Sequence, residues 1–146
     1  MLEDYGVEFI EQPVAPDDID GLAQLTRVSP IPIAADESCR TSADIPRLVG
    51  AVDNINIKLA KCGSLREALR MVHCARVHGL RVMLGCMIES SLGIAAAVQL
   101  APLMDYVDLD GAALLGADPF RGPGIDGTGN VRFNDEPGLG VARAGD

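Results

Sequence analysis

Charged side chains stand where several short apolar segments of this sequence end. Lys58 follows the branched residues Ile55 and Ile57, and Gly63 then separates it from a strong helix start. Parallel α/β folds place their chemistry at the carboxyl ends of strands. A single lysine is usually no more than a solvated side chain, but other strand ends in this chain carry carboxylates. The charged residues at these ends are Glu11, Asp36, Glu37, Lys58, Lys61, Asp108 and Asp110.

These residue types suit the removal of a proton from a carbon next to a carboxylate. Carboxylate oxygens, which the acids at these strand ends all supply, are the ligands that Mg²⁺ prefers. A lysine beside such a metal, for which Lys58 is the first candidate, could take the proton while the metal stabilises the negative charge that develops. Each acid alone is more often a helix cap or a surface charge. Their order at successive strand ends favours the catalytic interpretation.

The elements that must position these residues alternate between strand and helix. Strands are predicted over residues 7–10, 31–35, 54–59, 80–84 and 106–110. Helices are predicted over residues 17–27, from 41 or 42 to 49, from 64 to 79 with a capping box at its start, and from 90 or 91 to before Pro102. The strands are short and apolar on both sides, which is typical of buried parallel strands. The chain is therefore predicted to be a parallel α/β protein.

Periodicity does not distinguish a doubly wound sheet from a barrel. No glycine-rich phosphate loop follows any predicted strand, which weighs against a nucleotide-binding sheet. Residues after Leu115 are rich in Gly, Pro and Asp, so loops are expected there, with one short hairpin near residues 131–133.

Composition excludes several classes of partner. The 146 residues carry 12 basic and 21 acidic side chains, a net charge of −9, which argues against nucleic acid and anionic membranes. No stretch approaches the roughly 20 apolar residues of a membrane span, and the amino terminus has no signal-peptide character, so a cytoplasmic location is expected. The four cysteines form no C-x-x-C pair and are interpreted as small apolar side chains rather than metal ligands.

Five motifs in this order resemble the enolase superfamily, within its muconate lactonizing enzyme subgroup. They are Glu11-Gln12-Pro13, Ala35-Asp36-Glu37-Ser38, Asn56-Ile57-Lys58-Leu59-x-Lys61-x-Gly63, Gly85-Cys86-Met87-x-Glu89-Ser90-Ser91 and Asp108-Leu109-Asp110-Gly111. The last motif is similar to that of the dipeptide epimerases, among them the L-Ala-D/L-Glu epimerases. No histidine follows Leu84, so the mandelate racemase variant with a histidine base is disfavoured.

The resemblance implies a fold and a division of the chain. The fold is a TIM-type (β/α)₈ barrel, of which residues 1–115 would supply strands four to eight, and residues 116–146 would form a Gly- and Pro-rich tail. The family's amino-terminal domain, its first metal ligand and its lysine on the opposite substrate face have no counterpart here. A carboxyl-terminal fragment is therefore expected, one that self-associates or joins the missing amino-terminal part.

The resemblance also implies roles for the charged residues. Glu11 and Asp36 would be ligands of the cofactor Mg²⁺, and Lys58 would be the acid/base lysine. Asp108 and Asp110 would receive the ammonium group of a dipeptide substrate. Lys61 and Glu37 would contact the ligands rather than the metal.

The implied activity is a Mg²⁺-dependent epimerisation of dipeptides at the carbon next to the carboxylate. Two alternatives remain open at this point. One is another enzyme of the subgroup, a cycloisomerase or o-succinylbenzoate synthase, which needs no pair of acids for an ammonium group. The other is an inactive truncated product.

Overall fold

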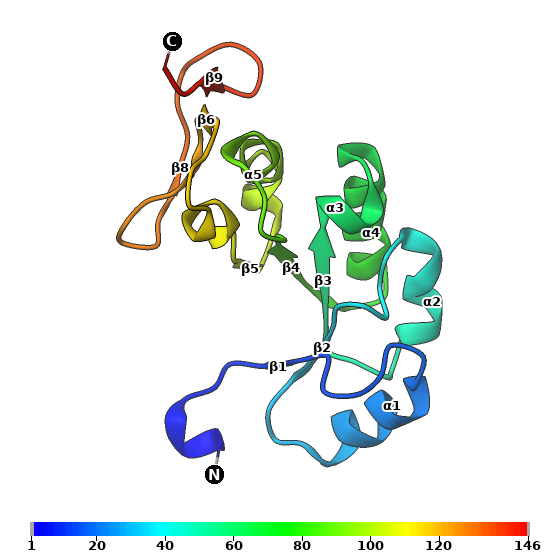
Figure 1. The fold of residues 1–146 in the computed structure, drawn as a ribbon. Helices are drawn as coiled ribbons and strands as arrows, with labels where there is room; N and C mark the ends of the chain where they lie inside the picture. Colours follow the sequence, from blue (N-terminus) through cyan, green and yellow to red (C-terminus); the bar gives the residue numbers. More distant parts are fainter. Residues whose placement is uncertain (1, 146) are drawn as a thin grey trace.

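Five short parallel strands in sequence order form the central sheet (Figure 1). They are β1 (Ile10–Glu11), β2 (Ile33–Ala35), β3 (Asn54–Lys58), β4 (Arg81–Gly85) and β5 (Tyr106–Val107). The structure is a computed structural model that describes residues 2–145. Every neighbouring pair of strands is parallel, and the sheet curls into part of a barrel. The predicted parallel α/β fold and its barrel form are confirmed.

The curl brings the two ends of the sheet towards each other. Phe9, which directly precedes β1, and Tyr106 of β5 have ring centroids 4.9 Å apart, although β1 and β5 are the outermost strands. Neither of these strands pairs with a further strand within residues 2–145. The predicted self-association depends on these free edges and stays a prediction.

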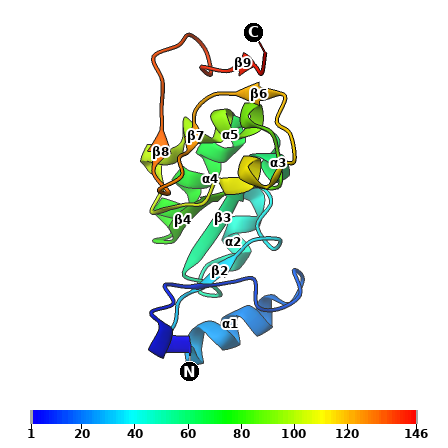
Figure 2. The ribbon, with the colours of Figure 1, turned by 60° about the vertical axis from the view of Figure 1, so that its left-hand side comes forward.

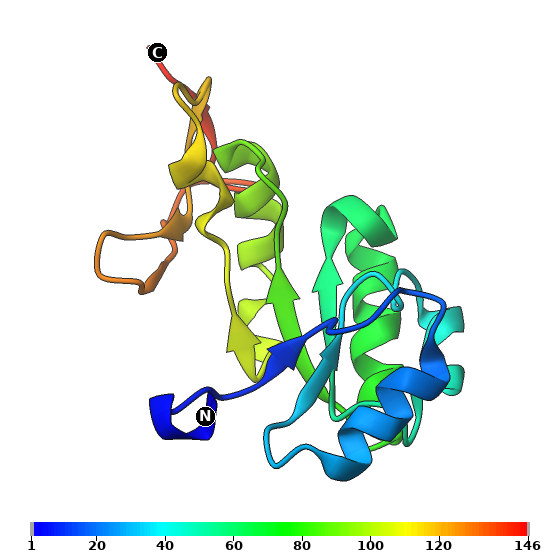
Figure 3. The same ribbon diagram turned by 60° about the horizontal axis from the view of Figure 1, so that its bottom comes forward.

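Helices follow the strands and lie together on the outer side of the arc (Figure 3). The α-helices are α1 (Ile19–Val28), α2 (Ile45–Leu48), α3 (Leu59–Cys62), α4 (Leu65–Val77) and α5 (Ser91–Val98). Single 3₁₀ turns are η1 (Leu2–Tyr5), η2 (Ser42–Asp44), η3 (Ala101–Leu103) and η4 (Asp110–Leu114). None of the helices within residues 2–145 has the length and apolar character needed to cross a membrane.

Strand alternation separates the core from the chemistry. In β3, Ile55 and Ile57 are fully buried in the hydrophobic core that the outer helices share. Asn54, Asn56 and Lys58 alternate with them and therefore face the inner side of the arc. The core stabilises the sheet, while the opposite side of the same strands carries polar groups.

Three predicted helix starts differ in detail. α1 begins at Ile19 rather than at residue 17, and the side chain of its cap, Asp18, accepts a hydrogen bond from Gly21 N at 2.8 Å. The helix predicted up to residue 49 is the 3₁₀ turn η2 followed by the single turn α2, with Pro46 in its first turn. The capping box before α4 is half formed: Ser64 accepts from Glu67 N, but the Glu67 side chain binds Ser42 instead.

The fifth strand is shorter than the predicted 106–110. It ends at Val107, although Asp108 N still donates to Leu84 O at 2.9 Å. Asp110 begins η4, because the chain turns at Leu109, where φ is −126° and ψ is 37°. Strand alternation therefore does not extend to Asp110.

The tail forms two small antiparallel pairs, visible from yellow-orange to red in Figure 2. β6 (Phe120–Arg121) pairs with β9 (Ala142–Arg143), and β7 (Gly124–Ile125) pairs with β8 (Val131–Arg132), close to the predicted hairpin. Asp118 ties the tail to α5, since its carboxylate accepts from Ser91 N and Ser91 Oγ, both at 2.7 Å. The division of the chain at residue 115 stays a prediction.

Candidate active site

The carboxyl ends of β1, β2 and β3 bring two acids and two lysines together in one cluster. Lys58 Nζ lies 2.9 Å from Asp36 Oδ2 and 3.7 Å from Glu11 Oε1. The Lys58 side chain is only 15% exposed and that of Asp36 only 7%. We call Glu11, Asp36, Lys58 and Lys61 the acid–lysine cluster. Glu11, Asp36 and Lys58 come from three adjacent strand ends, and Lys61 comes from the short helix after β3. The sequence predicted strand ends for these residues.

Lys61 binds the end of β2 from the opposite side. It lies in the short helix α3, which Gly63 ends with a positive φ of 80°. Its Nζ donates to the Asp36 carboxylate, to the Asp36 carbonyl at 2.7 Å and to the Asn56 carbonyl at 3.1 Å. Lys61 thus fixes Asp36 relative to β3 and leaves Lys58 as the lysine that faces both acids.

The local charges shift two pKa values in opposite directions. Burial raises the pKa of Asp36, but the hydrogen bonds and charges of Lys58 and Lys61 outweigh it and hold the pKa below the usual 3.8. Burial also lowers the pKa of Lys58, but its hydrogen bond to Asp36 and the charges of Asp36, Glu11 and Glu37 raise it above 10.5. The cluster therefore favours a protonated Lys58 as long as Asp36 remains its partner.

Two carboxamides in this cluster were missed by sequence reasoning. Asn56 Nδ2 donates to Glu11 Oε1 at 2.6 Å. Gln12 accepts from Asp36 N at 2.9 Å and from Ser38 N at 3.2 Å. Alternation with Lys58 in β3 was a usable signal for Asn56. The Gln12 contact had no such signal, because it depends on a left-handed backbone at Gln12, with φ of 40°.

Glu37 lies outside the hydrogen-bonded cluster. Its side chain is exposed, and its negative charge helps to raise the pKa of Lys58. The predicted contact between Glu37 and the metal ligands is not among the hydrogen bonds and ion pairs of residues 2–145.

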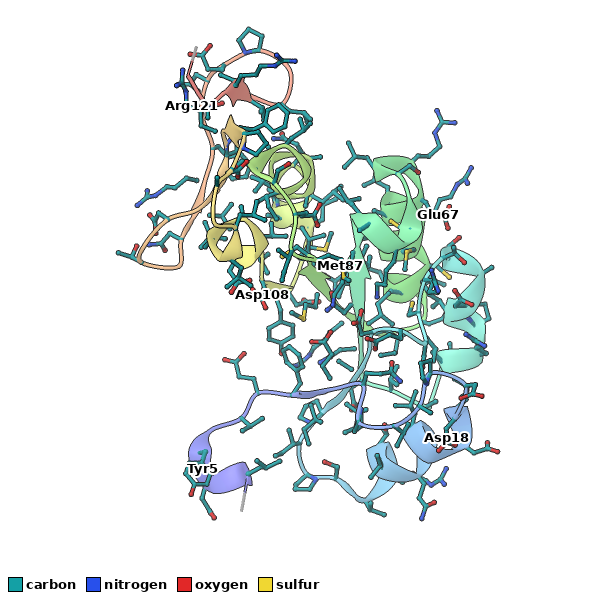
Figure 4. The ribbon with its side chains drawn as sticks, viewed as in Figure 1. Tyr5, Asp18, Glu67, Met87, Asp108 and Arg121 are labelled. Atoms are coloured by element: carbon teal, nitrogen blue, oxygen red, sulfur yellow. The ribbon has the colours of Figure 1, made fainter. Side chains whose placement is uncertain are left out.

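Asp108 and Asp110 lie on the other side of the barrel mouth, directly after β5 and at the start of η4. Both are exposed, whereas Leu109 between them is 1% exposed and packs in the core. Burial raises the pKa of the nearby Cys86 thiol, and the charges of both aspartates raise it further. The charges of the two acids therefore act on the same thiol, near the loop after β4, where Figure 4 labels Met87 and Asp108.

A pocket of about 260 Å³ opens beside these acids. Its lining is formed by Cys86, Met87, Ile88, Asp110, Gly111 and Leu114. Gly111 packs so closely on the β4 loop that a Cβ there would lie 2.0 Å from the Met87 carbonyl oxygen. Any side chain at position 111 would push the two loops apart, which explains the glycine after Asp110.

The acid–lysine cluster offers oxygen donors to a Mg²⁺ ion from two side chains, Glu11 and Asp36. No three acid, imidazole or thiol side chains converge on a common point within the described part of the chain. Glu11 and Asp36 do converge on one positive charge, the Lys58 ammonium. Since Mg²⁺ is commonly held by one or two carboxylates with water at its remaining positions, this pair of oxygen donors fits the ion.

Several known proteins are similar to this chain. The L-Ala-D/L-Glu epimerase of Bacteroides thetaiotaomicron is 44% identical over 97% of the chain, and the L-Ala-D/L-amino acid epimerase of a Maribacter species is 47% identical over 97%. The chain spans only 37% and 42% of the lengths of these relatives.

Solved structures of dipeptide epimerases are also similar to this chain. A substrate-liganded L-Ala-D/L-Glu epimerase from Bacillus subtilis superposes with a TM-score of 0.90 at 36% identity, over 98% of this chain and 42% of that one. A dipeptide epimerase from Cytophaga hutchinsonii, complexed with Mg and D-Ala-L-Val, gives 0.91 at 33% identity, over 99% and 41%. The family model described as "Enolase C-terminal domain-like" matches residues 1–144, and the chain belongs to that family.

Proposed function

We propose that this chain supplies the carboxyl-terminal part of the barrel of a Mg²⁺-dependent dipeptide epimerase. One observation carries the proposal: Lys58 lies between Glu11 and Asp36 at adjacent strand ends, in a chain whose relatives are dipeptide epimerases. The reaction would invert the carbon next to the dipeptide's carboxylate by removing its proton on one face and returning a proton on the other.

Glu11 and Asp36 would hold the metal. Bound Mg²⁺ would stabilise the additional negative charge that the substrate carboxylate acquires when the neighbouring carbon loses its proton. Lys61 and Gln12 bind the Asp36 backbone, and Lys61 also binds its carboxylate, so that carboxylate would enter the reaction already oriented.

Lys58 would exchange the proton on one face of the substrate. Its Nζ is the only lysine nitrogen that lies near both Glu11 and Asp36 in the described chain. Burial lowers the pKa of Lys58, and only its acidic neighbours reverse that effect. When another cation neutralises those acids, the remaining effect of burial favours the neutral amine that a base requires.

Asp108 and Asp110 would select a substrate that carries an ammonium group. Both are exposed near the mouth, beside the 260 Å³ pocket. Two neighbouring carboxylates repel each other, and a cation between them removes that repulsion. The free amino group of a dipeptide supplies such a cation. A cycloisomerase, in contrast, needs no pair of acids for an ammonium group.

A chimera tests the proposal. This chain would replace the segment that it matches in the Bacteroides epimerase, so that the rest of that enzyme completes the protein. L-Ala-L-Glu and a hydrophobic dipeptide would be incubated with the chimera and Mg²⁺. Chiral chromatography would then measure the epimer that forms. Epimerisation of either dipeptide is expected. A folded chimera that turns over a cycloisomerase or o-succinylbenzoate synthase substrate but no dipeptide would contradict the proposal.

A further inference from the structure

Asn56 is a buried polar residue that touches one of the proposed metal ligands. It is 1% exposed, and its Nδ2 donates to Glu11 Oε1 at 2.6 Å. Its Oδ1 has no hydrogen-bond partner among the described residues, so the amide is oriented by Glu11 alone. The contact joins β3 to β1 across the inner side of β2, between residues 45 positions apart in the sequence.

Gly85 leaves the space in which Asn56 lies. It is paired with Lys58 in the register of β3 and β4. A Cβ at position 85 would lie 2.6 Å from Asn56 Oδ1, 2.8 Å from Asn56 Nδ2 and 3.0 Å from Lys58 Cε. Since real Cβ atoms do not approach other atoms to 2.6 Å, a side chain here would displace the amide or the lysine.

We propose that Asn56 is the positioning residue of Glu11, with Gly85 providing the room for it. This inference rests on the proposed function, because it concerns how Glu11 presents its carboxylate to a divalent cation. The Glu11 side chain is 34% exposed and has several rotatable bonds. The Asn56 hydrogen bond fixes one carboxylate oxygen of this side chain at 2.6 Å. A positioned ligand binds more tightly because its conformational freedom is already lost before the cation arrives.

The same strand provides a matched control. Asn54 is also fully buried on the inner side of β3, two residues before Asn56. Its amide atoms have no partner among the described residues, Glu11 included. Replacement of either asparagine by leucine keeps the size of the side chain and removes a buried amide. Only the change at Asn56 also removes the contact with Glu11.

The experiment measures Mn²⁺ binding to this chain by water-proton relaxation, which detects weak sites and needs no catalytic activity. The unsubstituted chain, Asn54→Leu and Asn56→Leu would be compared, with thermal unfolding of each followed by circular dichroism. Asn54→Leu is expected to bind Mn²⁺ as the unsubstituted chain does. Asn56→Leu is expected to bind about 10-fold to 100-fold more weakly, the usual effect of losing a partner behind a metal ligand, at an unfolding temperature similar to that of Asn54→Leu.

Each outcome decides the inference. Equal Mn²⁺ affinities for the two leucine variants, or no Mn²⁺ binding by the unsubstituted chain, would overturn it. A purely structural role would lower the unfolding temperature of Asn56→Leu and leave its affinity unchanged. If Asn56→Leu does not fold, Gly85→Ala decides, because its Cβ comes closest to the Asn56 amide and crowds it without removing it. Weakened binding supports the inference, and unchanged binding overturns it. Mn²⁺ binding without dipeptide turnover in the chimera would sink the proposed function and leave this inference standing.

Discussion

The acids in the two halves of the barrel mouth differ in whether lysines lie beside them. At the ends of β1 to β3, Asp36 is bound by both Lys58 and Lys61, and Glu11 lies near Lys58. After β5, Asp108 and Asp110 are exposed and have no ion pair within residues 2–145. The first half is assembled by the protein's own charges, whereas the second presents unneutralised negative charge.

The difference follows from the strands beneath. β3 and β4 pair over five residues, which fixes the register of Lys58 opposite Gly85. β5 pairs with β4 over two residues only and then turns into η4. We infer that the first half is preorganised for a metal and proton transfer, and that the second is adapted to a cation delivered by the substrate.

The largest expected effect comes from Lys58 in the chimera. Lys58→Ala should reduce epimerisation by about 10²-fold to 10⁴-fold, the usual contribution of a general acid/base. Lys58→Arg is the matched control, because it keeps a positive charge beside Asp36 but cannot lose its proton. A chiral assay should show a loss of this size in both variants. Near-normal turnover in either would place the base elsewhere, with Lys61 as the next candidate.

A smaller effect is expected in the other half of the mouth. Replacing Asp108 and Asp110 together by Asn removes the negative charge that would bind the substrate ammonium. KM for a free-amino dipeptide should therefore rise by about 10-fold to 100-fold, or about 1.4 kcal/mol for each factor of ten. The N-acetyl dipeptide has no ammonium group and should be affected much less. Steady-state kinetics on the two substrates provide the comparison. Equal changes in KM would favour a cycloisomerase-like substrate.

The positions of the charged residues at the barrel mouth could largely be predicted from the sequence, whereas some of their contacts could not. Strand alternation indicated which residues lie at the mouth, because it depends only on local periodicity. The order of the motifs added their resemblance to a known family. The contact from Asn56 to Glu11 could not be predicted, since it depends on the curl of the sheet. The positive φ at Gln12 and the exposed position of Glu37 likewise depend on packing between strands.

Metal binding by the isolated chain should be weak. The proposed site has two carboxylates, those of Glu11 and Asp36, and Lys58 competes for both. Mg²⁺ is therefore expected to bind in the millimolar range, corresponding to about 4 kcal/mol. Isothermal titration calorimetry measures this directly. Micromolar affinity would mean that a further ligand belongs to the site.

The smallest effect concerns the tail behind the second half of the mouth. The hydrogen bond from Ser91 is the main cause that lowers the pKa of Asp118 below 3.8. Because the folded pKa lies below the unfolded one, this stabilisation is present above about pH 3.8 and is lost as the pH falls further.

Asp118→Asn should therefore lower the unfolding temperature of the chain slightly at neutral pH and less in acid. Thermal scans of both proteins across the acid range would record the difference. A difference that stays constant from neutral pH to strong acid would show that the Asp118 charge does not stabilise the tail.

The central claim, that Lys58 exchanges the proton on one substrate face, is tested most directly by deuterium incorporation. Each epimer of a dipeptide would be incubated separately in D₂O with the unsubstituted chimera and with its Lys58→Arg variant, and exchange at the carbon next to the carboxylate followed by NMR. The account predicts that the variant loses exchange for one epimer and retains it for the other, whose proton faces the opposite base. Unchanged exchange of both epimers in the variant would contradict it.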